Sequence, residues 1–211
     1  MPEHYVVMGD IVRSRDYEEK QLMRDFANLI EACNREFAAG ILSPYTVTLG
    51  DEYQGVAASL LWSVRTIIYL DEARLHGEYS FKMRHVVHFG DVATPLNKVV
   101  AYGMLGSGLT KARELLTDKR RGRPRFCFSL PDQQLSSNLR QLLEVMSSIT
   151  NAWKPRDVAI IFAMLANDND TEVATELGKN RSQIWKRRKS LFIDEYKALR
   201  MVVLELAREK C

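Results

Sequence analysis

Two short segments of this chain carry acidic residues at the ends of apolar runs. The first run, Tyr5–Val12, contains Gly9-Asp10, and the second segment, Tyr45–Val56, has Gly50-Asp51-Glu52 between two β-like stretches. Carboxylate oxygens bind hard divalent cations such as Mg²⁺ together with substrate phosphates, as in two-metal phosphoryl-transfer sites. Asp and Gly are also favoured in tight turns for backbone reasons, so the second segment taken alone favours an ordinary turn.

The order of the expected elements brings these acids together. In a β-α-β-β unit the first and second strands run parallel with the third strand between them, so Asp10 and Asp51 emerge at the same end of the sheet. We therefore predict a Mg²⁺ or Mn²⁺ site formed by Asp10, Asp51 and Glu52. A fourth strand runs opposite to the first, which delivers Asp91 to the other end and leaves Arg84 nearer the site.

Glycine-rich and basic segments supply candidates for phosphate binding. The backbone amides of a Gly-rich loop at a helix start, here Tyr102–Leu116, form a cradle for phosphate. Ser14 and Arg15 follow the first strand, where the alternative is a solvated loop. The basic stretch Lys119–Arg125 fits phosphate contacts or, more commonly, a solvated turn. The candidate nucleotide-binding residues are Ser14, Arg15, Arg84, Gly106, Ser107, Thr110, Lys111 and Arg113.

Three motifs in the first part of the chain form a recognisable set. They are Gly9-Asp-Ile-Val-Arg-Ser-Arg15, Leu49-Gly-Asp-Glu-Tyr-Gln-Gly55 and Lys111-Ala-Arg-Glu114. Together they resemble the motifs of the SatD family of small bacterial proteins, and the likeness covers roughly residues 4–129. The set is moderately specific, whereas each motif alone is weak.

More loosely, the two acidic segments resemble the metal-binding segments of class III nucleotide cyclases, GGDEF domains and polymerase palm domains. This resemblance implies a palm-like domain that binds a nucleoside triphosphate and a divalent ion. The Gly-rich segment departs from the cyclase pattern, because Thr110 stands where cyclases carry the Asn that orients the ribose. Arg113 likewise falls one residue before the cyclase arginine that stabilises the leaving phosphate. These departures weaken the assignment of cyclase activity more than they weaken the assignment of nucleotide binding.

The last sixty residues form the basic part of the chain. Residues 1–150 hold 18 basic and 18 acidic side chains, whereas residues 151–211 hold 12 basic and 9 acidic ones. Ala174, Gly178 and Ile184 fit the small residue, the turn glycine and the apolar anchor of a helix-turn-helix. This part of the chain is therefore predicted to bind DNA.

The last helix of this pattern begins at Arg181 and has a basic surface. From Lys179 to Lys189 there are six basic residues and no acidic ones. Its first side chains are expected to enter the major groove, and its later ones to reach phosphates. The alternative is an αα-hairpin with a solvated basic face. The predicted DNA-binding residues are Arg181, Ser182, Gln183, Lys186, Arg187, Arg188 and Lys189.

The 211-residue composition, with 46% hydrophobic and 27% charged residues, is that of an ordinary globular protein. Cys33, Cys127 and Cys211 lie far apart without Cys-x-x-Cys spacing, which favours reduced thiols in the cytoplasm over zinc or disulfides. His85 and His88, three apart on a strand, point to opposite faces and do not form a ligand pair. No apolar run reaches the ~18 residues of a membrane span, so no membrane partner is expected.

The expected fold class is α/β (α+β). A ferredoxin-like palm or cyclase-like domain spans 1–130, a connecting helix spans 131–154, and an all-α helix-turn-helix domain with a C-terminal helix spans 155–211. The leading hypothesis is a cytoplasmic regulator that couples nucleotide and metal binding to DNA binding. One alternative is a Mg-dependent nucleotidyl cyclase or nucleotidyltransferase, and another is a DNA-binding or scaffolding protein without a nucleotide ligand.

The C-terminal helix has a regular apolar spacing that allows two interpretations. A 4-3-4-3 spacing over two heptads fits a homodimer contact, and it fits packing onto the rest of the chain equally well. The residues with this spacing are Phe192, Tyr196, Leu199, Val203 and Leu206.

Overall fold

The computed structural model describes residues 2–73, 75, 79, 81–118 and 122–208. Its first part alternates strands and helices, as the sequence predicts. Helix α1 begins at Glu19, where the Glu18 side chain caps it by accepting from the N–H groups of Lys20 and Gln21. The elements are β1 (Glu3–Ile11), α1 (Glu19–Glu36), β2 (Ile41–Val47), β3 (Glu52–Ala57), α2 (Leu60–Ala73), β4 (Met83–Asp91), α3 (Ser107–Thr117) and β5 (Phe126–Ser129).

The five strands form one mixed sheet in the order β2-β3-β1-β4-β5. All neighbours are antiparallel except β4 and β5, so β1 and β2 run parallel with β3 between them. Asp10 lies opposite Glu52, and the Ile11 N–H donates to the Asp51 carbonyl at 2.9 Å. Asp91 lies opposite Glu3 at the other end of the sheet. The backbones of Asp10 and Asp51 therefore meet at one end, as expected.

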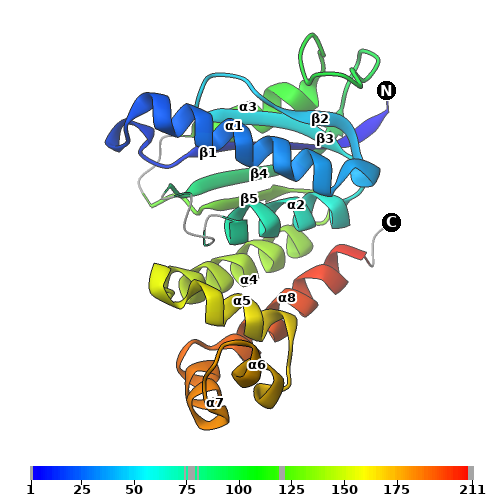
Figure 1. Cartoon of the computed structure of the whole chain (residues 1–211). Helices are drawn as coiled ribbons and strands as arrows, with labels where there is room; N and C mark the ends of the chain where they lie inside the picture. The colour runs from blue at the N-terminus through cyan, green and yellow to red at the C-terminus, as the bar shows by residue number, and fades with distance from the viewer. Residues whose placement is uncertain (1, 74, 76–78, 80, 119–121, 209–211) are drawn as a thin grey trace.

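Helices cover both faces of the sheet (Figure 1). Alternate side chains point to opposite faces of a strand, so Val7 packs with α1 and α2 whereas Val6 packs with α3. At the acidic end of β1, Gly9 leaves room for an aromatic ring. A Cβ added to Gly9 would lie 2.4 Å from the Tyr53 ring and 2.6 Å from the Arg84 carbonyl. Any side chain at position 9 would therefore disturb both neighbouring strands.

The second part of the chain is helical. A 20-residue helix, α4, runs beside β5, and the chain then turns at Lys154-Pro155, near the predicted boundary. Three short helices follow, and the last helix, α8, returns toward α2 (Figure 1). These elements are α4 (Gln133–Ala152), α5 (Val158–Ala166), α6 (Asp170–Glu176), α7 (Arg181–Ser190) and α8 (Ile193–Arg208).

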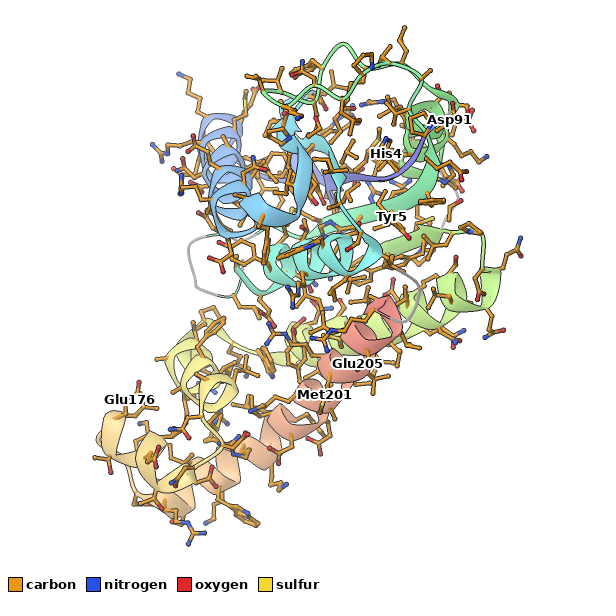
Figure 2. All side chains as sticks on the ribbon, turned by 90° about the vertical axis from the view of Figure 1, so that its right-hand side faces the viewer. His4, Tyr5, Asp91, Glu176, Met201 and Glu205 are labelled. Atoms are coloured by element: carbon orange, nitrogen blue, oxygen red, sulfur yellow. The ribbon has the colours of Figure 1, made fainter. Side chains whose placement is uncertain are left out.

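The apolar side of α8 packs within the chain, which is the second of the two expected interpretations. Tyr196 and Val203 are buried in the same hydrophobic cluster that holds core residues of the sheet. Phe192, by contrast, is 53% exposed. Figure 2 shows Met201 and Glu205 along the outer side of α8. Packing against α2 and α4 therefore accounts for most of the apolar spacing, and a homodimer stays a prediction.

Polar contacts also join the two parts. The Trp153 Nε1–H donates to the Leu191 carbonyl at 2.8 Å, and the Tyr196 hydroxyl donates to Glu72 on α2 at 2.9 Å. One hydrophobic cluster continues from the sheet to α7 and α8. The domain boundaries stay a prediction, but the helical part and the sheet share a core.

Within the described residues, none of the helices is both long and apolar enough to span a membrane. Cys33 is buried, Cys127 is half-buried, and both are free thiols. Cys211 lies outside the described residues.

Candidate functional site

The acidic end of the sheet is a network of carboxylates paired with arginines. Asp10 accepts two bonds from Arg84, at 2.7 Å from Nε and 2.5 Å from Nη2, and a third guanidinium contact comes from Arg123 at 3.6 Å. Glu52 accepts from Arg113 of α3 at 2.8 Å. The Asp10 and Glu52 side chains are only 14% and 17% exposed, so these charge-assisted bonds are partly shielded from water.

Asp51 takes part in a separate hollow. Together with Ser14 and Arg15, it lines a cavity of about 440 Å³ whose apolar wall includes Leu22 and Met23 of α1. Asp10 and Asp51 are therefore neighbours along the backbone, while their carboxylates face different surroundings. The structure brings Ser14, Arg15 and Asp51 together around this hollow.

The predicted metal ligands do not fit a divalent ion in this arrangement. Both carboxylate oxygens of Asp10 already accept bonds from Arg84, and Glu52 is paired with Arg113. Throughout the described ranges, no three His, Cys, Asp or Glu side chains are grouped so that they could hold a metal. A magnesium ion at Asp10 would have to displace a bidentate arginine. The metal site thus stays a prediction from the sequence.

The Gly-rich segment lies at the opposite end of the sheet from Asp10. The Ser107 hydroxyl at the start of α3 donates to Asp91, which lies beside His4 in Figure 2. Glu3 and Asp10 are seven residues apart on β1, which corresponds to roughly 23 Å along a strand. Gly106 and Gly108 serve close packing, because an added Cβ would lie 2.4 Å and 2.8 Å from the Asp91 carbonyl.

The predicted nucleotide-binding residues consequently fall into three places. Ser14 and Arg15 line the hollow with Asp51, whereas Arg84 and Arg113 join the carboxylate network. The third group, at the start of α3, comprises Gly106, Ser107, Thr110 and Lys111.

Three arginines outside the predicted site residues also lie at this site. Arg123 and Arg125 precede β5, and Arg140 is on α4. Arg123 reaches Asp10, and Arg125 donates to Met83, Ser147 and Asp71. Arg140 lines a cavity beside them. The basic run before β5 was a usable signal, although the rest of that run, Lys119–Arg121, lies outside the described residues.

In the helical part, α6 and α7 are joined by a tight turn. Gly178 adopts φ +61°, a left-handed conformation that favours glycine, and the Lys179 N–H donates to the Ala174 carbonyl at 2.8 Å. Asn180 caps α7 by accepting from the Gln183 N–H at 3.0 Å, and the Gln183 side chain bonds back in a capping box. Ile184 is fully buried and anchors α7 to the core.

The predicted DNA-binding side chains of α7 divide into exposed and paired groups. Arg187 pairs with Asp157 at 2.6 Å, and Lys189 pairs with Asp194 at 2.8 Å, a bond that raises the pKa of Lys189. Trp185, which is not among the predicted contacts, is 54% exposed. The predicted contacts that are exposed without an acidic partner among the described residues are Arg181, Ser182, Gln183 and Lys186.

Arg188 differs from the expectation that it reaches DNA phosphates. Its side chain is only 6% exposed and donates to Asp170 at 2.7 Å. It also donates to the carbonyls of Met164 and Asn167. Arg188 thus ties α7 to α5 and α6 inside the helical part.

Comparison with known proteins identifies the family of this chain. A search of curated proteins found no match. A family model described as the SatD family matches residues 4–206, which extends the expected likeness from residue 129 through the helical part. Because this match spans nearly the whole chain, the protein belongs to the SatD family.

Proposed function

We propose that this protein is a DNA-binding regulator that uses the exposed face of α7 to bind DNA. The observation that supports this most strongly is the sorting of the α7 side chains. Arg181 and Lys186 are exposed without acidic partners among the described residues, while Ile184 and Arg188 hold the helix in place. A rigid helix that presents unpaired cations suits contact with phosphates and base edges.

The shape of this region supports the same proposal. Helix α7 has 10 residues, which gives a length of about 15 Å, and an α-helix fits the major groove of B-DNA. The turn at Gly178 and the Asn180 cap fix the start of the helix, where base contacts are made in helix-turn-helix proteins. The exposed Trp185 adds a flat surface for contact with the DNA backbone.

We further propose that the α/β part binds a nucleotide that controls DNA binding. Support comes from the gathering of arginines at the acidic end of the sheet, because guanidinium groups that pair with carboxylates also match phosphate oxygens. The direct contacts of α8 with α2 offer a route between the two parts. Such a ligand would act only if it bound one arrangement of the helices more tightly than another.

Among the described residues, no contact favours the enzymatic alternative over this proposal. Asp10 and Glu52, two of the three carboxylates that a cyclase or nucleotidyltransferase would use, are paired with arginines, and the Thr110 and Arg113 departures remain. The other alternative is a DNA-binding protein without a nucleotide ligand, and the tests below distinguish it from this proposal.

Fluorescence anisotropy with a labelled DNA duplex tests the DNA-binding half. We expect Arg181→Ala combined with Lys186→Ala to weaken binding about tenfold or more and to lower the salt slope, because each lost phosphate contact reduces that slope by about 1. Arg35→Ala removes an exposed arginine of α1 and serves as the matched control. Equal affinity of the double variant and the control for DNA would contradict the proposal.

A further inference from the structure

A cavity of about 480 Å³ lies between α3, α4 and the strands β4 and β5. Four arginines from three stretches of chain line it: Arg84 on β4, Arg123 and Arg125 before β5, and Arg140 on α4. Asp118 is the one acidic residue among the described lining residues. The volume falls within the range of about 300–1,000 Å³ that is typical of small-molecule sites.

Two of these arginines are held by carboxylates and carbonyls of the fold. Arg84 donates two bonds to Asp10. Arg125 donates to the Met83 carbonyl at 2.9 Å, to the Ser147 hydroxyl at 2.5 Å and to Asp71. Their positions are therefore fixed before any ligand arrives, which lowers the ordering cost of binding.

Arg123 donates one bond to the Leu116 carbonyl, while the nearby Asp10 and Asp118 carboxylates offset its charge only in part. Its ion pair with Asp10 spans 3.6 Å, and Arg84 already occupies both oxygens of that carboxylate. The Arg123 side chain is 17% exposed, and burial lowers the pKa of its guanidinium, with the nearby Arg84 charge acting in the same direction. An anion in the cavity would stabilise the charged guanidinium against both burial and the Arg84 charge.

Arg140 forms no hydrogen bond or ion pair with any residue in the described part of the chain. Ser136 and Ser137 lie four and three residues earlier on α4, so all three share one side of the helix and line the same cavity. This side therefore offers the uncommitted Arg140 guanidinium and the Ser137 hydroxyl, whereas the Ser136 hydroxyl already donates to the Asp132 carbonyl and accepts from the Leu130 N–H. Leu115 and Phe128 provide apolar wall nearby.

We infer that this cavity binds a small phosphate-bearing ligand, with Arg123 and Arg140 contacting the phosphate and Ser136 and Ser137 beside them. Guanidinium groups match phosphate oxygens in a planar, bidentate geometry, and the apolar wall accommodates the remainder of the ligand. The inference rests on the ligand-binding half of the proposed function and gives it a location. That location is separate from the predicted phosphate cradle at Gly106–Lys111.

Isothermal titration of the full chain tests this inference. The probes are inorganic phosphate, a nucleoside monophosphate, a nucleoside triphosphate and, as a carboxylate comparison, citrate. At least one phosphate compound should bind, and Arg140→Gln should weaken that binding at least tenfold without changing the melting temperature of the ligand-free protein. Arg35→Gln makes the same charge change on the exposed surface of α1 and should bind like the wild type.

Three outcomes would overturn the inference: no phosphate compound binds, citrate binds as well as phosphate does, or Arg140→Gln binds unchanged. Triphosphate binding that survives Arg140→Gln but is lost in Arg113→Gln would place the nucleotide at the acidic end of the sheet. That result would overturn the inference and leave the proposed function intact. Phosphate binding that depends on Arg140, in a protein that does not bind DNA, would support the inference and refute the DNA-binding proposal.

Discussion

At the scale of single residues, the charged side chains of this protein divide into those that build the fold and those that stay available. Arg188 and Lys186 lie two residues apart on α7 and illustrate the division, because one is buried among carboxylates and the other is exposed. Sequence charge alone does not separate them. The position of Arg188 in the sequence does indicate its burial, because it lies four residues after the buried Ile184 and hence on the same face of the helix.

We predict that Arg188→Ala destabilises the helical part strongly. Removing the guanidinium leaves Asp170 without its 2.7 Å partner in a largely buried position and frees two carbonyls, which costs about 3–5 kcal/mol for a buried pair. Chemical denaturation of the variant measures this loss of unfolding free energy. Arg35→Ala, which breaks an exposed pair, should change stability little. Similar stability of both variants would refute the structural role of Arg188.

His85 predicts a pH dependence of stability. It is buried against Tyr53 and Phe126, and burial lowers its pKa from 6.5 to about 3, with the Arg125 charge adding to the effect. The unfolded chain therefore takes up a proton near pH 6.5, whereas the folded chain does so only near pH 3. The contribution of neutral His85 to the free energy of unfolding is complete above pH 6.5. It is lost as the pH falls from 6.5 toward 3, by up to about 1.4 kcal/mol per pH unit.

Urea denaturation of the wild type and His85→Gln between pH 4 and pH 8 measures this contribution. The difference in unfolding free energy between the two proteins should shrink as the pH falls below 6.5, because only the wild type carries the buried imidazole. Parallel curves over the whole range would show that His85 does not titrate differently in the folded and unfolded chains.

At the scale of elements, strand topology was predictable and side-chain pairing was not. Two Gly-Asp segments and the expected β-α-β-β order sufficed to place Asp10 beside Asp51 along the backbone. Whether their carboxylates converge depends on the partners that later elements supply. Arg113 and Arg123 arrive from α3 and from the segment before β5, more than sixty residues after the hairpin, and local patterns do not encode such pairing.

This pairing predicts that Mg²⁺ has no specific effect on the wild-type protein. The melting temperature should be the same in millimolar MgCl₂ and in KCl of equal ionic strength, because Asp10 and Glu52 already have cationic partners. Differential scanning fluorimetry with and without EDTA provides the measurement. A chelator-reversible rise in melting temperature with Mg²⁺ would support the metal site that the cyclase resemblance implies.

At the scale of the whole molecule, the two parts of the chain are packed together. Helix α8 packs against α2 and α4, and the Trp153 and Tyr196 side chains add direct hydrogen bonds. The sequence alone does not show whether α8 packs within the chain, because an apolar heptad spacing is the same for a dimer contact and for packing within one chain. Helix α4 lines the arginine cavity and also contacts α8, so a ligand there would lie close to the helices that hold α7.

Hydrogen–deuterium exchange of the full chain, with and without a DNA duplex, tests the central claim most directly. We predict that DNA slows exchange in residues 178–190, the turn and helix α7, while the sheet stays unchanged. Loss of this protection in the Arg181→Ala and Lys186→Ala double variant would be the accompanying result. Protection confined to the sheet, or no protection at any DNA concentration, would contradict the assignment of α7 as the DNA-binding helix.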